Sequence, residues 1–368
     1  MRSPWDSRLH VSSRKSCGKE NMKTPLLILG CSVLFGLGAV TSETESTAGY
    51  SIINRIHLTG DGGWDCCELD EASGRLFISH DTQVQVVDVA AGKQHGVIGD
   101  TKGVHDIAFV RELNKAYVSN GKDTSVSIVD FKSLALLKKI RVTGEDPDGI
   151  TYDPFSRCIF VFNGKSENVT VIDSRTDKVV ATIALGGSPE FSAADGNGQL
   201  YVNLEDKNEV AVINTQSMTV EKEWPVAPAQ KPCAMAMDYK NHRLFIGCRS
   251  RVMVVMNAQT GNVIASLPIG DHVDAAAFDP VKKRIFFSNG DGTVTVIGAS
   301  ANDVYAVVEN IVTQKGSKTM ALSKTSHHLY LPGADFLPAP APTADNPKPR
   351  AKVKSGSFVV LDIAPVEK

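Results

Sequence analysis

The fold is decided by residues 147–185, PDGITYDPFSRCIFVFNGKSENVTVIDSRTDKVVATIAL. Four short apolar runs rich in Val, Ile and Phe alternate here with the polar segments DPFSR, GKSEN and RTDK. Apolar runs of this length, bounded by Gly, Asn and Asp, are typical of β-strands. The Asp-Pro pair favours a turn, because proline presets φ and aspartate hydrogen-bonds its own backbone. The stretch therefore predicts one four-stranded antiparallel unit.

The same unit recurs along the chain, and its second strand carries one aromatic residue at a fixed place. The seven aromatic residues are Phe77, Tyr117, Phe160, Tyr201, Phe245, Phe286 and Tyr330. Their successive spacings are 40, 43, 41, 44, 41 and 44 residues. A period near forty with four strands per unit indicates propeller blades, which bury their faces only against neighbouring blades. The sequence therefore predicts an all-β fold, a seven-bladed β-propeller with four-stranded antiparallel blades.

The two ends of the repeat array indicate how the ring closes. A lone strand at about 51–58 precedes the first unit, whereas the last unit has only three strands. We predict that the N-terminal strand completes the C-terminal blade, because closure removes an exposed strand edge. Residues 49–368 are expected to form a single propeller domain, with a proline-rich insertion at 334–355 in blade seven.

The N-terminal segment has the regions of a secretory signal. A lysine after Met22 precedes an apolar run and then polar residues, an arrangement typical of a signal peptide. We interpret residues 22–48 as a signal peptide with a short linker, and residues 1–21 as an extension upstream of the true start. The apolar run is short for a membrane span, so we expect no transmembrane segment in the mature chain. A lipid-anchored form at Cys31 is the alternative, and the residues before it fit poorly.

The second strands carry a recognisable sequence signature. The third strands do not end in the WD dipeptide that is typical of WD40 repeats. Tyr117–Val118–Ser119–Asn120 and Tyr201–Val202–Asn203 lie close to a YVTN motif, and Pro147–Asp148–Gly149 matches the start of its blade. Over about residues 52–363 the chain resembles the YVTN-repeat (YncE-like) β-propellers of secreted bacterial proteins. The resemblance implies a seven-bladed propeller in the periplasm or outside the cell, in a family whose role is often binding.

Blade geometry predicts which side chains share one rim of the central channel. The first strand starts at the channel mouth and the second returns to it, so hairpin pairing sets Asp65 opposite His80, and likewise in later blades. Convergent polar groups at the mouth of a β-structure are the default place for a ligand. The predicted binding rim consists of Asp65, His80, His105, Asp106, Asn120, Asp148, Asn163, Glu190, Arg249, His272, Asp274 and Asn289. Each acid has an alternative role, since turn aspartates commonly bind backbone amides.

The cofactor is left open by the sequence. Five carboxylates near one another would raise each other's pKa or recruit a cation. Hard oxygen ligands favour calcium or magnesium, so a divalent cation at the mouth is one candidate. The histidines follow no zinc or copper spacing, and we assign no metal ligands. The sequence contains no C-x-x-C-H haem motif and no G-x-S-x-G nucleophile elbow.

Two functions from different classes remain. The first is a secreted or periplasmic scaffold that binds a small molecule, a glycan or a protein through the polar loop face. The alternative is a propeller-type hydrolase or lyase, similar to lactonases, with rim acids and His105 or His272 in acid–base roles. Strongly raised carboxylate pKa values in a deep pocket would favour the enzyme, and a flat, wet face would favour binding.

The charge of the chain limits the kinds of partner that we expect it to bind. The formal net charge is −2, and the one basic block of the mature part lies at residues 348–354. Phosphate binding needs a clustered positive surface, so we expect no nucleic acid. We also expect a monomer.

Two further predictions concern cysteines and the insertion. Cys233 and Cys248 fall opposite each other in the fifth hairpin, and an oxidising compartment would permit a disulfide, provided that the Cα atoms lie within about 7 Å. Two buried free thiols are the alternative. The insertion, long for a loop inside a repeat, is expected to form a lid over the rim through Phe336, Leu337 and Arg350. A solvated linker is the alternative.

Overall fold

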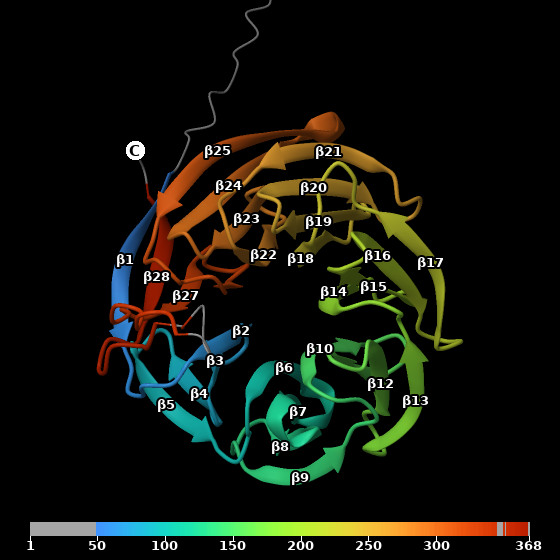
Figure 1. The fold of residues 1–368 in the computed structure, drawn as a ribbon, viewed down its shortest axis with the longest axis horizontal. Helices are drawn as coiled ribbons and strands as arrows, with labels where there is room; N and C mark the ends of the chain where they lie inside the picture. The colour runs from blue at the N-terminus through green and yellow to red at the C-terminus, as the bar shows by residue number, and fades with distance from the viewer. Residues whose placement is uncertain (1–48, 344–348, 350, 367–368) are drawn as a thin grey trace, which may run out of the picture. The chain divides into compact units, whose positions relative to one another are not determined.

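A computed structural model describes residues 49–343, 349 and 351–366 of the chain. The predicted signal peptide and upstream extension (residues 1–48) and the predicted lid residue Arg350 lie outside the described residues. The described part forms seven four-stranded antiparallel sheets arranged in a ring (Figure 1). This arrangement confirms the seven-bladed β-propeller expected from the aromatic repeat. Described helix is limited to three single 3₁₀ turns, and no helix among these residues is long and apolar enough to cross a membrane.

Six blades are built from consecutive strands, ordered from the channel outward. Blade one consists of β2 (Trp64–Asp70), β3 (Arg75–His80), β4 (Gln83–Asp88) and β5 (Lys93–Ile98), and blade two of β6 (Val104–Val110), β7 (Lys115–Asn120), β8 (Ser125–Asp130) and β9 (Leu136–Arg141). Blade three consists of β10 (Pro147–Asp153), β11 (Cys158–Asn163), β12 (Asn168–Asp173) and β13 (Lys178–Ala184), and blade four of β14 (Pro189–Ala194), β15 (Gln199–Leu204), β16 (Glu209–Asn214) and β17 (Thr219–Pro225). Blade five consists of β18 (Pro232–Asp238), β19 (Arg243–Cys248), β20 (Val252–Asn257) and β21 (Val263–Pro268), and blade six of β22 (Val273–Asp279), β23 (Arg284–Asn289), β24 (Thr293–Ser300) and β25 (Val304–Val312).

Blade seven joins the two ends of the array. It contains β26 (Ala321–Leu322), β27 (Leu329–Gly333) and β28 (Val359–Val366), and its outer strand is β1 (Gly49–His57). Strand β1 pairs with β28 along its length, from Gly49 opposite Val366 to His57 opposite Val359. Both strands lie at the same edge of the ring in Figure 1. The predicted closure by an N-terminal strand is therefore confirmed.

The repeated aromatic residues form the contacts between blades. All seven are buried, with exposed fractions between 0% and 5%. Where the residue is tyrosine, its hydroxyl can also reach the next blade: Tyr117 donates to the Ser174 carbonyl at 3.0 Å, and Tyr201 donates to the Ala258 carbonyl at 2.7 Å. The fixed place of the aromatic residue thus reflects packing of each blade on its neighbour.

The first strand of each of the six consecutive blades contains a register irregularity near its start. In blade one, Trp64 pairs with His80 and Cys67 with Ile78, so two residues on β2 face one on β3. Blades two to six show the same extra residue. The predicted pair Asp65–His80 and its counterparts are therefore wrong, because a β-bulge shifts the register at the start of the strand.

We expect deletion of residues 49–58 to destabilise the propeller strongly. The deletion removes the buried side chains of Tyr50, Ile56 and Leu58 and leaves β28 unpaired on one side. Loss of large buried side chains costs about 2–5 kcal/mol each, so the free energy of unfolding should fall by at least about 5 kcal/mol. Urea denaturation measures this change. The control is Ile53→Ala on the same strand, whose side chain is 52% exposed. A truncated protein as stable as its parent would contradict the observed closure.

Candidate functional site

The bulges of blades one to six place one side chain per blade at an equivalent position at the channel mouth. The register gives this position to the first bulge residue, three residues before the one that pairs with the repeated aromatic residue. In blade seven Ala321 pairs with Tyr330, so Lys318 holds the corresponding place before β26. The equivalent residues are Asp65, His105, Asp148, Glu190, Cys233, Asp274 and Lys318. Four of the five predicted rim acids are in this set. Asp106 is one residue out, and His105 takes its place.

Three of these residues, from blades one to three, form the mouth triad: Asp65, His105 and Asp148. The His105 Nδ1 atom lies 2.7 Å from Asp65 Oδ2 and 3.4 Å from Asp148 Oδ1. Burial lowers the pKa of His105, but the hydrogen bond to Asp65 and the charges of both carboxylates outweigh this effect and raise it to about 9. The imidazole is therefore protonated at neutral pH and carries a positive charge between two carboxylates.

Asp148 is the most open member of the triad. Removal of water by the surrounding channel walls raises the pKa of its carboxyl to about 6, and the charge of His105 opposes the rise. The side chain is 47% exposed, so water entering the mouth screens part of this effect. Asp148 is thus the triad carboxylate best placed to meet a ligand.

Lys318 is a rim residue that the sequence analysis missed. Its ammonium lies 2.9 Å from Asp274 Oδ2 and 3.8 Å from Asp65 Oδ1, so it links blade six to blade one. Burial raises the pKa of Asp274, and the charge of Lys318 opposes this. A signal was available in the sequence, since Lys318 stands at the same place relative to Tyr330 as Asp65 does relative to Phe77.

A second cluster, the Glu190–Arg249 group, faces the mouth from blades four and five. The Arg249 guanidinium lies 3.6 Å from Glu190 and 3.5 Å from Glu205. Burial raises the pKa of Glu190 to about 8, and Arg249 opposes the rise. The Cys233 thiol, whose pKa is raised by burial, donates to Glu190 Oε2 at 3.3 Å. Arg249 therefore lies at the rim as predicted, and Glu205 and Cys233 are additions.

Asp106 takes the structural role that was left open for each acid. Its carboxylate accepts hydrogen bonds from the backbone amides of Ile107, at 2.8 Å, and Ile150, at 3.2 Å. Because Ile150 belongs to blade three, this bond joins two blades. Burial also raises the pKa of Asp106.

The predicted rim residues at the ends of second strands lie elsewhere. His80 is 2% exposed and stacks on Phe358 with ring centroids 4.4 Å apart. The three asparagines are fully buried, and their side-chain amides donate to hydroxyls of the third strand of their own blade; they are Asn120, Asn163 and Asn289. The bulge explains these differences, because it pairs each strand-two end with a backbone position one residue before the rim side chain.

His272 also stands apart from the clusters. Its side chain is 78% exposed, and its Nδ1 lies 3.3 Å from Asp271. No contact with the triad or with the Glu190–Arg249 group is found for it in the described residues. These contacts therefore give no support to an acid–base role for His272 together with the rim carboxylates.

The predicted disulfide is absent. The five cysteines within the described residues are free and buried. Cys248 pairs with Pro232 across the hairpin, and Cys233 lies in the bulge, where its thiol contacts Glu190 and Arg249. The one-residue shift in register thus removes the apposition on which the disulfide depended.

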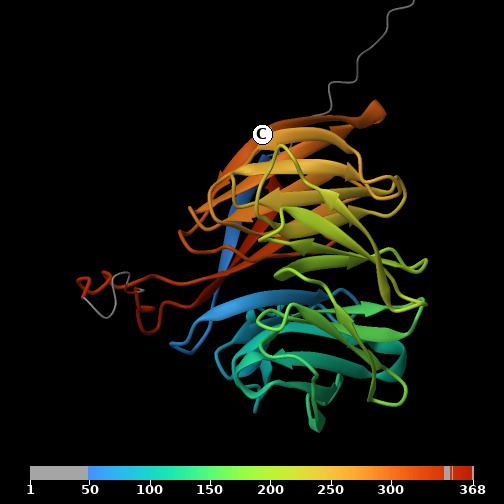
Figure 2. The ribbon, with the colours of Figure 1, turned by 45° about the vertical axis from the view of Figure 1, so that its right-hand side comes forward.

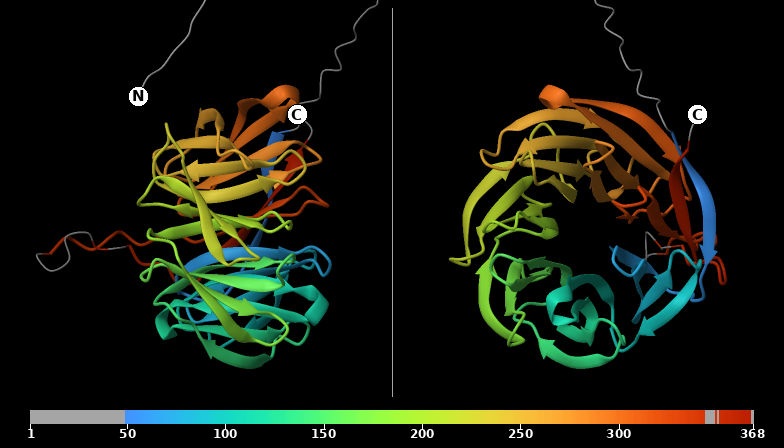
Figure 3. Two further views of the ribbon diagram at one scale, coloured as in Figure 1. Left: turned by 90° about the vertical axis from the view of Figure 1, so that its right-hand side faces the viewer. Right: turned by 180° about the vertical axis from the view of Figure 1, so that it is seen from behind.

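The described part of the proline-rich insertion forms an extension between β27 and β28, joined by one isolated bridge. Phe336 bridges to Val353, and the Leu337 amide donates to the Lys352 carbonyl at 2.8 Å. At its base, Phe336 contacts Trp64 with ring centroids 5.9 Å apart. The extension stands out from the ring (Figures 2 and 3), and Leu337 is 47% exposed. It does not lie across the mouth, so the lid role remains a prediction without support from these contacts.

Cavities occur at both ends of the channel and between two blades. The mouth pocket, of about 100 Å³, has four carboxylates in its wall, from Glu68, Asp106, Asp148 and Glu190. A larger hollow of about 410 Å³ shares Glu68 and extends toward the other end.

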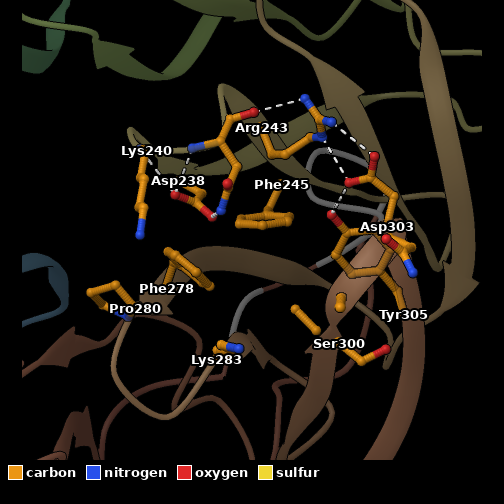
Figure 4. A pocket seen from close by; sticks show the side chains of 14 residues that line it. Asp238, Lys240, Arg243, Phe245, Phe278, Pro280, Lys283, Ser300, Asp303 and Tyr305 are labelled. Atoms are coloured by element: carbon orange, nitrogen blue, oxygen red, sulfur yellow. Dashed lines mark hydrogen bonds and ion pairs between the residues drawn. The ribbon is translucent and has the colours of Figure 1, made fainter.

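A third hollow, of about 420 Å³, lies between blades five and six (Figure 4). Its charged groups pair with one another: Arg243 binds both carboxylate oxygens of Asp303, and the Tyr305 hydroxyl donates to the same carboxylate. In Figure 4 the side chains of Arg243, Asp303 and Tyr305 point toward one another at one side of the hollow. The mouth pocket is therefore the stronger candidate site, because the mouth keeps carboxylates open to solvent.

Comparison with known proteins agrees with the fold and with the repeat. No protein-family model matches the chain. The chain is similar to the protein YncE of Salmonella typhimurium, at 23% identity over 221 residues that cover 59% of this chain and 50% of that protein. It is also similar to antigen Lp49 of Leptospira interrogans, at 23% identity over 304 residues that cover 73% of this chain and 64% of that protein. The chain thus spans about half the length of YncE and less than two thirds of Lp49.

Solved structures support the architecture alone. Hydrazine synthase of Kuenenia stuttgartiensis superposes with a TM-score of 0.64 at 20% identity, covering 75% of this chain and 94% of that chain. The WD40 repeats of RRP9 superpose with a TM-score of 0.70 at 9% identity, covering 85% and 97%. Together with the sequence relatives, these findings define the class: the chain is a seven-bladed β-propeller with sequence similarity to YncE.

The charge on His105 gives a pH-dependent signature. Its folded-state pKa lies above the ordinary value of 6.5, so its stabilising effect is complete below about pH 6.5 and is lost as pH rises through about 9. NMR titration of the imidazole should give a midpoint near pH 9, and Asp65→Asn should lower it. Asp271→Asn, outside the triad, is the control. A midpoint near 6.5 in the unmodified protein would contradict this geometry.

Proposed function

We propose that this YncE-like propeller is a secreted or periplasmic binding protein that holds a polar ligand at the mouth of its channel. The observation that carries the proposal is the set of ionisable side chains that the bulges direct to one end of the ring. The N-terminal signal-peptide pattern and the resemblance to secreted propellers support the location. A charged residue at a rigid strand position keeps its geometry better than one on a mobile loop.

The size and charge of the mouth favour a particular kind of ligand. A pocket of about 100 Å³ admits one small functional group rather than a whole large molecule. Carboxylates line the pocket, and Arg249 pairs with Glu190 in its wall, so a ligand with several hydrogen-bonding groups finds acceptors and a donor together. A small polar molecule, or one terminal group of a glycan or a protein, fits these limits.

An acid–base enzyme is the second candidate. Glu190, with a pKa of about 8, would be largely protonated at neutral pH and able to donate a proton, whereas Asp148 would be largely ionised. Two carboxyl groups held in opposite protonation states are the usual arrangement for general acid–base catalysis. This pairing favours a hydrolase or lyase of the lactonase type.

Ligand retention tests the binding function. We expect native mass spectrometry of protein purified from the periplasm to show a retained small molecule, and Asp148→Asn to lower its occupancy at least tenfold. Asp271→Asn, on the same face outside the pocket, should retain the ligand. Equal occupancy in the Asp148 variant would place the ligand elsewhere. Hydrolysis of a simple aliphatic lactone, at least about 100-fold slower in Glu190→Gln, would favour the enzyme instead.

A further inference from the structure

The mouth triad offers a donor set that differs from a ring of acids. His105 supplies an imidazole nitrogen once an incoming cation displaces its proton to water, and Asp65 and Asp148 each supply a carboxylate oxygen. These donor atoms all lie within 4.8 Å of one another. The three side chains come from consecutive blades and from the equivalent bulge position, so rigid strands hold each of them. All three are partly open to the channel, which leaves room for water or a ligand.

We infer that the mouth triad is a binding site for one zinc-type divalent cation, with an open coordination position toward the channel. This inference rests on the proposed function, because it names what the same site holds. Zinc bound by three protein ligands typically keeps a fourth position for water or substrate.

The distances are compatible with this coordination. With metal–ligand bonds of about 2.0–2.2 Å and tetrahedral angles, neighbouring donor atoms lie about 3.4 Å apart. His105 Nδ1 and Asp148 Oδ1 are already 3.4 Å apart, whereas His105 Nδ1 and Asp65 Oδ2 are 2.7 Å apart. The Asp65 carboxylate therefore has to move by roughly 0.7 Å, a shift within reach of side-chain rotation.

The imidazole nitrogen decides which cation is favoured. Calcium takes six to eight oxygen ligands, and magnesium is bound through oxygen as well, whereas imidazole suits zinc, copper and nickel. The far side of His105 is arranged in a way that suits a ligand. Gly121 leaves space there: a Cβ at Gly121 would lie 2.6 Å from His105 Nε2 and 2.9 Å from Asp146 Oδ1. Asp146 acts on His105 through its charge and not through a hydrogen bond.

Lys318 lies next to the triad, and its positive charge offers a way to test whether a cation binds there. Its ammonium lies 3.8 Å from Asp65 Oδ1, so it repels a cation at the triad while it does not supply a ligand atom. Removal of this charge should strengthen metal binding, whereas removal of a ligand should weaken it. A merely adventitious surface site would not respond to both changes in opposite directions.

Isothermal titration of the metal-free full propeller with Zn²⁺ tests the inference. We expect one zinc per chain, affinity at least about 100-fold weaker in His105→Gln, and affinity about three- to tenfold tighter in Lys318→Met. His272→Gln, which removes an exposed histidine outside the triad, should bind as the unmodified protein does. Ca²⁺ should not compete at equal concentration.

Two measurements keep the test independent of variant folding. Thermal melting of each variant confirms that it is folded, and Co²⁺ bound to the unmodified protein should show visible absorption bands of a low-coordinate site with nitrogen and oxygen donors. Absence of stoichiometric zinc, zinc affinity unaffected by His105→Gln, or equal competition by Ca²⁺ would each overturn the inference. Retention of the periplasmic ligand in the presence of EDTA would overturn the metal site and leave the binding function intact.

Discussion

One extra residue near the start of the innermost strand in blades one to six determines which side chains lie at the channel mouth. In a regular antiparallel pair, side chains alternate between the two faces of the sheet, and in a propeller both faces pack on neighbouring blades. A polar side chain at this position would then be buried between blades without water. The bulge releases one residue from the ladder and re-aims its side chain. Apolar neighbours such as Ile107 and Ile150 remain buried, so each blade combines a hydrophobic interface with a charged rim.

The sequence predicted the fold well because the fold depends on spacing. An aromatic residue every forty or so positions is what inter-blade packing requires, and the structure buries all seven. The missing strand of blade seven followed from counting, since an incomplete blade would leave an exposed edge. Arg249 was also found at the rim, because loops after second strands lie on a known face.

The site was predicted less well, and the reason is physical. A bulge shifts register by one residue without changing composition or periodicity, so nothing in the letters separates His105 from Asp106 as the rim residue. The same shift moved three asparagines from the predicted rim into the blade interior, where their amides satisfy strand hydroxyls, and removed the apposition of Cys233 and Cys248. Lys318 holds the equivalent position in blade seven, three residues before the partner of Tyr330, and it was missed for the same reason.

The placement of bases explains why the mouth differs from the anionic ring that five acids suggest. His105 stands between Asp65 and Asp148, Lys318 between Asp274 and Asp65, and Arg249 between Glu190 and Glu205. Each partly buried carboxylate is thereby compensated, which limits the cost of removing charges from water. The arrangement also fixes the side chains, because each base contacts acids from two directions. A ligand that enters the mouth therefore meets a preorganised set of charges, and its affinity depends on replacing one of these ion pairs with contacts of equal strength.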